Sequence, residues 1–360
     1  MRQGDQLRVP AERVGRQIAA LLAAWGMPEA LVADSVEMLL AADLAGIDSH
    51  GLSMLPIYDD WRRQGKLVMA PEITVVRDRP TTALLDGGGG LGHAVSKRAM
   101  LLAIEKAQAT DVGVVTVRRS HHYGAAGVYA LMAAERGLIG ISATNVHTPS
   151  VVPLWGAETR FGTNPWAFAA PASRNRPFLL DMATSTAAIG KLKLAWLAGK
   201  SVPEGWVVDA EGRPITDAET ALKERRLTPL GASRELGGHK GYGLAMMVEI
   251  LSATLPGAQF APARIARDPA AKLPDVGHFF MALNPEAFRE KGAFERDMDE
   301  MIEILRATRP TEAGRPVQVP GDPEYKAEAE RRRAGIPVPA MLARQIETLC
   351  RESAAPYLLA

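Results

Sequence analysis

The sequence predicts an α/β protein that begins and ends with helices. Residues 11–42 have the periodicity of two amphipathic helices, interrupted at Trp25-Gly26-Met27-Pro28, where the glycine ends one helix and the proline begins the next. From about residue 73, short apolar runs typical of strands alternate with helical stretches. A charged helix and a last helix reaching residue 354 close the chain. The fold type therefore changes from helical to α/β near residue 73.

Length and composition predict a large globular protein. The 360 residues are 47% hydrophobic, enough to bury the cores of two or three domains. Lys and Arg number 42 against 41 Asp and Glu, a net charge of +1 that favours neither a nucleic acid nor a membrane as partner. No apolar run reaches the roughly 18 to 20 residues that span a bilayer, so we expect a cytoplasmic protein. The single cysteine, Cys350, cannot form an intramolecular disulfide and is predicted to be a buried helix residue.

The tetrapeptide Asp48-Ser49-His50-Gly51 is the most compact group of proton-handling side chains in the chain. It lies between the first two helices and a third helix predicted over residues 52–64. On these four residues alone, a helix cap with a surface histidine is the simpler interpretation. A catalytic imidazole is the alternative.

A run of glycines from residue 87 to 92 offers a Gly-x-Gly-x-x-Gly match between a predicted strand at 82–85 and a predicted helix at 94–109. Four consecutive glycines make that match almost automatic. The following strand, 112–117, runs into Arg118 and Arg119, whereas a dinucleotide fingerprint needs an acidic residue there for the ribose. We therefore predict a glycine-rich turn at a strand–helix junction and only a weak case for a Rossmann phosphate loop.

A second pair of imidazoles follows in Ser120-His121-His122-Tyr123-Gly124. Adjacent residues of a regular element point in different directions, so we expect at most one of the two histidines to face a site. No further His or carboxylate ligands stand at metal-binding spacing, and no metal site is predicted.

Two later stretches are candidate anion sites. A strand beginning at residue 178 ends in the hydroxyl run 184–186, which fits either an anion site at a helix start or an ordinary N-cap. After polar loops and short elements at 199–234, a glycine-rich segment brings Lys240 near a ligand or forms a tight turn with a solvated lysine. It leads into an apolar helix at 244–255 that belongs in a core or a subunit interface. A strand at 278–283 and a charged helix at 285–308 complete this part.

Six blocks in one order resemble the malate/L-lactate dehydrogenase family of NAD(P)-dependent oxidoreductases, which also includes ureidoglycolate, sulfolactate and diketogulonate dehydrogenases. The resemblance runs nearly end to end, and it implies a non-Rossmann α/β fold: a mixed-sheet nucleotide-binding domain and a helical domain built from the N- and C-terminal segments. The domains would be residues 1–75, 76–310 and 311–360. The blocks are Gly46-Ile-Asp-Ser-His-Gly51, Ser120-His-His-Tyr-Gly124, Gly162-Thr-Asn-Pro165, Asp181-Met-Ala-Thr-Ser185, Gly238-His-Lys-Gly-Tyr-Gly-Leu244 and Pro320-Gly-Asp-Pro-Glu324 with Gly335-Ile-Pro337.

The resemblance also implies a site and a reaction. A homodimeric enzyme would move a hydride between NAD or NADP and a small 2-hydroxy acid, 2-keto acid or related cyclic imine. His50 would be the acid/base group and His122 the second imidazole, with Ser49, Met54 and His147 binding substrate. The cofactor-binding residues would be Asn145, Thr163, Asn164, Pro165, Asp181, Met182, Ala183, Thr184, Ser185, Thr186, His239, Lys240, Gly321 and Asp322.

One residue departs from the family pattern. The family places an Arg four residues after the site histidine, where it is expected to grip the substrate carboxylate, and here that position is Met54. A thioether cannot donate the bidentate hydrogen bonds of a guanidinium. Either another cation such as Arg62, Arg63 or Lys240 replaces it, or the substrate is not an ordinary 2-keto acid. A second hypothesis, from a different functional class, is a non-catalytic relative that binds ligand without turnover.

Overall fold

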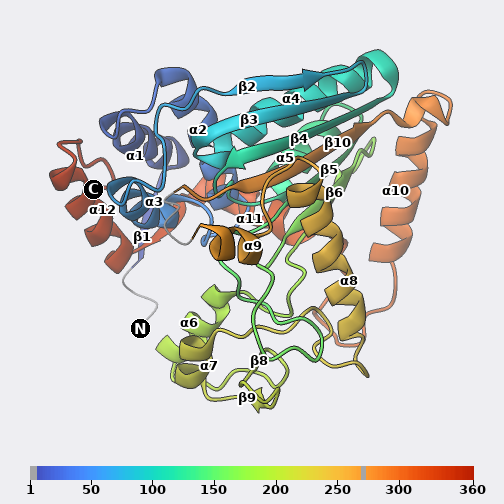
Figure 1. The fold of residues 1–360 in the computed structure, drawn as a ribbon. Helices are drawn as coiled ribbons and strands as arrows, with labels where there is room; N and C mark the ends of the chain where they lie inside the picture. The colour runs from blue at the N-terminus through green and yellow to red at the C-terminus, as the bar shows by residue number, and fades with distance from the viewer. Residues whose placement is uncertain (1–5, 269–272) are drawn as a thin grey trace.

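The computed structural model describes residues 6–268 and 273–360. A mixed sheet lies beside a helical part made from both ends of the chain (Figure 1). This is the predicted fold class, including the helical part assembled from the N- and C-terminal segments.

Helices from the two ends of the chain share one hydrophobic core. Val14, Leu21 and Leu55 from the N-terminal segment cluster with Ile346 and Leu349 from the C-terminal one, and this burial stabilises the pairing of the two ends. Two short strands pair antiparallel and tie the ends together. The elements are β1 (Gln6–Val9), α1 (Ala11–Ala24), α2 (Glu29–Leu44), η1 (Leu52–Met54), α3 (Leu55–Arg63), α11 (Asp322–Ala334), β11 (Ile336–Pro339) and α12 (Ala340–Glu352).

The predicted helix boundaries near residue 26 are confirmed, because α1 ends and α2 begins on either side of residues 25–28. Cys350 is buried in α12, also as predicted.

Within the described ranges, the main sheet has seven strands in the order β2-β3-β4-β10-β5-β6-β7. Only β3 and β4 run parallel, joined by α4 (Gly92–Thr110), and every other neighbouring pair is antiparallel. Strand β10, which comes late in the chain, lies between β4 and β5. The strands are β2 (Thr74–Asp78), β3 (Thr82–Gly90), β4 (Val112–Ser120), β5 (Ile139–Thr144), β6 (Trp166–Ala170), β7 (Phe178–Met182) and β10 (Val276–Leu283).

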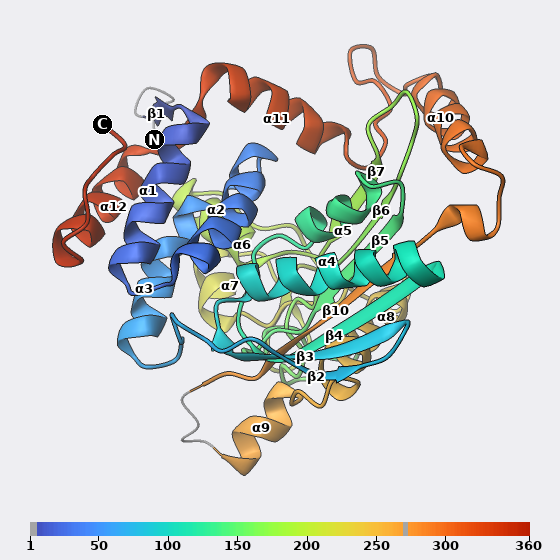
Figure 2. The same ribbon diagram turned by 90° about the horizontal axis from the view of Figure 1, so that it is seen from above.

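Helices cover both faces of this sheet (Figure 2). α4 and α5 (Gly127–Ala134) pack on one face, and α8 (Gly238–Glu249) with the π-helical turn η2 (Ile250–Thr254) on the other. α2 packs on α4 and so joins the helical part to the sheet. α10 (Ala293–Arg306), which follows η3 (Pro285–Ala287), packs beside β6 and β7.

The stretch predicted as loops and short elements forms a small lobe with its own apolar cluster, at the bottom of Figure 1. It contains α6 (Ile189–Leu197), β8 (Val207–Val208), β9 (Pro214–Ile215) and α7 (Ala218–Glu224), and α9 (Ala261–Arg267) lies above it. None of the helices in the described residues has the length and apolarity needed to cross a membrane.

The glycine run forms part of a strand, and the predicted turn is therefore wrong. Residues 87–90 continue β3, with positive φ angles at Gly88 and Gly89 and a shift of register against β4. The segment before β2 covers this run: Val68 donates its N–H to the carbonyl of Gly89, and a Cβ at Gly90 would collide with the ring of Pro71. The run needs glycines because another part of the chain lies against it.

Candidate active site

His50 lies at the end of the loop that connects α2 to η1. Its ring is stacked on that of His122, with 5.5 Å between ring centroids and 24° between ring planes. The hydroxyl of Ser49 is 2.8 Å from Nδ1 of His50. The structure therefore brings together the two imidazoles that the sequence places 72 positions apart.

His122 follows β4 and is held from several sides. Gly92, the first residue of α4, donates its N–H to the carbonyl of His122 at 3.0 Å. The hydroxyl of Tyr58, on α3, is 2.7 Å from Nδ1 of the His122 ring, and the N–H of Gly124 points to the same nitrogen at 3.4 Å. A backbone N–H can only donate, so Nδ1 is an acceptor and the neutral ring carries its proton on Nε2.

Further aromatic rings surround this pair. Trp61, on α3, lies with its ring centroid 4.5 Å from that of His121 and 5.5 Å from that of His147. His93, at the start of α4, contacts the edges of Tyr58 and His122. Both adjacent histidines join the cluster, His121 through Trp61 and His147, because residues 121–124 are irregular, without the alternation of a strand. That at most one of them faces the site stays a prediction.

Burial makes the imidazoles of this cluster weak bases. It lowers the pKa of His50, and it lowers those of His121 and His122 well below the ordinary value, with help from the neighbouring imidazoles. The pKa of His93 falls to about 3 and that of His147 to about 4, the latter also through the positive charges of Arg264 and Lys66. At neutral pH these rings are therefore neutral.

The imidazoles are not arranged as a metal site. Among the described residues, no three or more His, Cys, Asp or Glu side chains are placed to share an ion. Nδ1 of His121 accepts the backbone N–H of His122, and Nδ1 of His122 is hydrogen-bonded to Tyr58. Neither nitrogen is therefore open to a metal ion.

Asp48, next to the site histidine in sequence, does not orient it. Its carboxylate forms an ion pair with Arg331 of α11. The nearest polar side chain to Nδ1 of His50 is instead Ser49.

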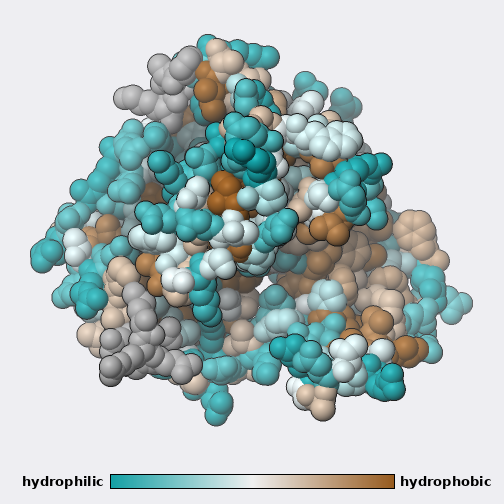
Figure 3. All heavy atoms as spheres, turned by 90° about the horizontal axis from the view of Figure 1, so that it is seen from below, coloured by the Kyte–Doolittle hydropathy of each residue, from teal (hydrophilic) through white to brown (hydrophobic). Residues whose placement is uncertain are grey.

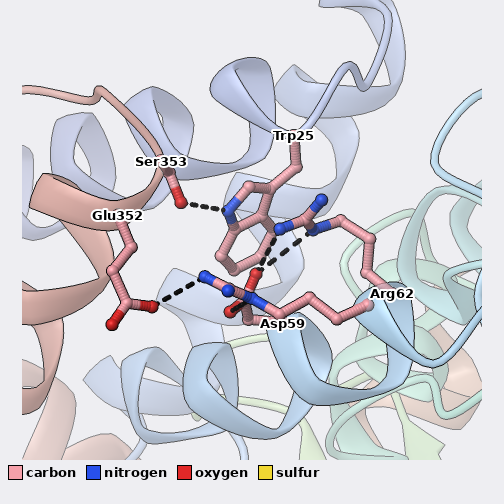
Figure 4. Close-up of polar contacts among 6 residues, drawn as sticks. Trp25, Asp59, Arg62, Glu352 and Ser353 are labelled. Carbon is pink, nitrogen blue, oxygen red and sulfur yellow. Dashed lines mark hydrogen bonds and ion pairs between the residues drawn. The ribbon is translucent and has the colours of Figure 1, made fainter.

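Arg62 and Arg63 are not free to take the place of the arginine that the family resemblance implies at position 54, because both are paired with other residues of the helical part (Figure 4). Arg62 donates to Asp59 at 2.6 Å and lies over the ring of Trp25, and Arg63 bridges Asp59 and Glu352. Asp59 is buried, so this network holds α3 against α12. Lys240 is exposed on α8.

Met54 ends η1 and is 9% exposed, within the core of the helical part. It therefore has little surface to offer a substrate. The family resemblance implies that Met54 binds substrate, and its packing limits that role.

The predicted cofactor blocks lie along β7, most of them after its last residue and the 321–322 block beside its start. Thr184 donates its N–H to Thr163 at 2.9 Å, and Leu230 donates to the carbonyl of Thr184 at 2.9 Å. Leu230 in turn packs against Gly241 of α8. At the other end of β7, Leu179 donates its N–H to Pro320, immediately before the Gly321-Asp322 pair at the start of α11. Met182 and Ala183 lie between these contacts, and Pro165 accepts from the N–H of Thr144.

Many polar atoms of these blocks already have partners within the chain. Thr184, Ser185 and Thr186 each donate their hydroxyl proton to a backbone carbonyl. Asp181 accepts from the N–H of Gly127, and burial raises its pKa to about 6. Asp322 pairs with Arg306. The helix expected directly after the hydroxyl run begins only at Ile189.

Asn145 and Asn164 point toward α8. Their side-chain amides donate to the two carboxylate oxygens of the buried Glu249, at 3.1 and 2.8 Å. The side-chain oxygen of Asn164 is buried and has no hydrogen-bond partner among the described residues. His239 and Lys240, in the first turn of α8, are exposed.

The sequence analysis missed three residues of this ring cluster: Tyr58, Trp61 and His93. Tyr58 and Trp61 are spaced three apart on a predicted amphipathic helix directly after the His50 motif, a signal that could have identified them, because residues three apart share a helix face.

Known proteins of one family are similar to this chain over most of its length. The family model for malate/L-lactate dehydrogenase matches residues 9–347. Malate dehydrogenase of Pyrococcus horikoshii is 42% identical over 335 residues, which cover 93% of this chain and 92% of that protein. L-sulfolactate dehydrogenase of Methanothermobacter thermautotrophicus is 38% identical over 347 residues, 96% of this chain and 97% of that protein. The crystal structure of malate dehydrogenase from Entamoeba histolytica matches with a TM-score of 0.93 at 32% identity, covering 98% of this chain and 99% of that one.

Proposed function

This chain is a dehydrogenase of the malate/L-lactate dehydrogenase family, and we propose that it transfers a hydride between NAD or NADP and a 2-hydroxy acid or the matching 2-keto acid. The observation that carries the proposal is the stacked pair His50 and His122, with 5.5 Å between the rings and one ring held by Tyr58. Imidazole is the side chain suited to proton exchange near neutral pH.

The proton chemistry follows from the state of these rings. With its pKa lowered by burial, His50 is neutral in the free site and can accept the hydroxyl proton of a 2-hydroxy acid as that acid is oxidised. A bound carboxylate favours the charged imidazole and therefore raises its pKa, which prepares the ring to donate a proton in the reverse direction. Of the two imidazoles, His122 carries its proton on Nε2 and can therefore donate a hydrogen bond to the substrate.

The residues around the end of β7 fit a nicotinamide dinucleotide. Lys240 and His239 stand in the first turn of α8, where the charge of the lysine and the helix dipole favour a phosphate. The unpaired buried oxygen of Asn164 calls for a donor such as a carboxamide N–H. When bound, the nicotinamide supplies or accepts the hydride. Asp181 to Thr186, Thr163 to Pro165 and Gly321-Asp322 shape the remaining walls.

We infer that the substrate carries a second anionic group. The similar proteins named above are a malate and an L-sulfolactate dehydrogenase, and both named substrates are 2-hydroxy acids with a second acid group. Two cations, Arg264 and Lys66, act electrostatically on His147. Arg264 makes no ion pair with any carboxylate in the described part of the chain. These cations, and not Arg62 or Arg63, are available to an anionic substrate.

The proposal includes a homodimer in the cytoplasm. Apolar side chains gather on the side of the molecule that carries α8 and α10 (Figure 3). Ile250 and Leu255, which follow α8, are more than half exposed. Light scattering should give about twice 38.6 kDa, and Ile250→Glu should halve that mass, whereas Leu194→Glu on α6, in the small lobe, should leave the mass unchanged.

The activity is tested by following NADH and NADPH absorbance with oxaloacetate, sulfopyruvate, pyruvate and a cyclic imine carboxylate. We expect turnover with the 2-keto acids, and fastest with those that carry two acid groups. Cofactor binding without turnover of any compound would support the non-catalytic alternative.

A further inference from the structure

The loop that carries His50 is short and has few contacts of its own. It spans residues 45–51 between α2 and η1, and its first three residues donate their N–H groups back to the last turn of α2. Beyond them, the N–H of His50 donates to the carbonyl of Ile47 at 2.9 Å. The side chain of Asp48 turns away from His50. The position of the imidazole therefore depends on what holds this loop from outside.

A buried carboxylate lies directly beneath the loop. Asp43, in the last turn of α2, is 3% exposed and accepts the N–H of Leu52 through Oδ2 at 2.8 Å. Its carboxyl group also occupies the space in which a Cβ at Gly51 would stand. Asp43 thus contacts the two residues that follow His50, and it leaves room there only for a glycine.

The opposite side of the loop rests on α11, from the other end of the chain. Arg331 donates to the backbone carbonyl of Asp43 at 2.6 Å and forms an ion pair with the carboxylate of Asp48. A Cβ at Gly46 would lie 3.1 Å from that of Ala327 on the same helix. The loop is therefore enclosed between α2 and α11.

Burial raises the pKa of Asp43 to about 7. The N–H of Leu52 and the charge of Arg331 oppose this rise, and the carboxylate of Asp48 adds to it. An asparagine would accept the same N–H without that charge.

We propose that Asp43 is the positioning residue for His50, fixing the backbone of residues 50–52 from beneath while Arg331 of α11 fixes the loop from outside. This inference rests on the proposed function, in which His50 exchanges the proton. A displacement of about 1 Å at a catalytic group can lower the rate about a hundredfold. The C-terminal segment is thus required for the site although it contributes no side chain that touches substrate.

The test is a set of variants at the contact between Asp43 and Gly51. Asp43→Ala should lower kcat about ten- to a hundredfold with little change in KM, and Asp43→Asn should stay within about threefold of wild type because its oxygen accepts the Leu52 N–H. Gly51→Ala should be as impaired as Asp43→Ala. The double variant Asp43→Ala/Gly51→Ala should recover part of the loss, because the added methyl group enters the vacated space.

Controls separate positioning from general stability. Asp299 is also buried and accepts backbone N–H groups, from Arg174 and Asn175, far from the site, so Asp299→Ala should lower the melting temperature without lowering kcat. Arg331→Ala should lower kcat as Asp43→Ala does, and it keeps the test usable if Asp43→Ala does not fold. Arg332→Ala, one position further on the same helix, should leave kcat unchanged.

A readout independent of turnover keeps the two proposals distinguishable. In the NMR titration of the protein without ligand, Asp43→Ala and Arg331→Ala should move the pKa of His50 toward its ordinary value, while the His278 signal stays unchanged. If the wild type reduces no keto acid but these shifts occur, the proposed reaction fails and the positioning stands. Unchanged kcat and an unchanged His50 titration in both variants would overturn the positioning.

Discussion

The hydroxyl of Tyr58 lies 2.7 Å from Nδ1 of His122, where α3 of the helical part meets the end of β4. This hydrogen bond crosses between the two parts of the fold and, together with the N–H of Gly124, occupies Nδ1 of the imidazole. The site exists only when both parts are packed together.

Removing this hydroxyl should change the pH profile. Its O–H stabilises the neutral ring of His122, so Tyr58→Phe should raise the pKa of His122 and move the acid limb of kcat/KM to higher pH. A lost hydrogen bond of about 1.4 kcal/mol corresponds to about a tenfold loss of rate. Tyr129→Phe is the matched control, since that buried tyrosine donates instead to the carbonyl of Tyr123. The same pH profile in both variants would remove Tyr58 from the mechanism.

Removing either imidazole should abolish most turnover. His50→Ala and His122→Ala should each lower kcat by about a hundredfold or more, the size expected for a positioned acid/base group. Circular dichroism and the melting temperature check that the fold is intact. A variant with near wild-type kcat would show that its histidine takes no part in the proton transfer.

If a phosphate of the cofactor binds at the start of α8, Lys240 should matter for cofactor binding and Arg119 should not. Lys240→Ala should weaken binding of the nicotinamide dinucleotide about tenfold, because it removes a charge from the first turn of that helix. Arg119→Ala should leave binding unchanged, since Arg119 pairs with Asp86 beside a glycine run that the chain itself covers. Titration with NADH and NADPH measures both. If Arg119→Ala weakens cofactor binding more than Lys240→Ala does, the cofactor binds at the glycine run instead.

Arg264 offers a test of how the substrate carboxylate is held. Arg264→Ala should raise KM for a dicarboxylic keto acid about tenfold or more, as expected for a lost charge-assisted bond. Arg267→Ala, also on α9, is the control. If Arg264→Ala leaves KM unchanged, the carboxylate is held by another residue.

The buried imidazole of His93 should weaken the fold in acid. Both of its nitrogens are without hydrogen bonds among the described residues, and its pKa in the folded protein is about 3. Below about pH 6.5 the unfolded chain binds a proton that the folded one does not, so stability is lost progressively as pH falls toward 3. At pH 5 the loss is about 2 kcal/mol.

His93→Leu removes this loss of stability. Comparing the variant with the wild type also cancels the contribution of other groups, such as Asp43, whose raised pKa increases the stability of the folded protein as the pH falls. Urea unfolding at pH 7.5 and pH 5 should therefore show the variant gaining about 2 kcal/mol on the wild type at the lower pH. If the free energy of unfolding of the two proteins changes equally between pH 7.5 and pH 5, the low pKa of His93 is contradicted.

The sequence by itself determined the elements whose signals are local. Gly26 and Pro28 mark the ends of α1 and α2 because their backbone preferences act on adjacent residues. The change from helical to alternating periodicity placed the start of the sheet near residue 73. The residue blocks around His50 and His122 indicated the family, and from it the non-Rossmann fold.

Only the tertiary structure decided which distant residues meet. β10 enters the sheet between β4 and β5, Pro71 covers the glycine run at Gly90, and Arg331 reaches the loop of His50 from the other end of the chain. Such contacts depend on the packing of whole helices and strands, and no local periodicity encodes them. For the same reason the partner of His122 is Tyr58, 64 positions away, and the carboxylate beside the His50 loop is Asp43, with the neighbouring Asp48 drawn away to α11.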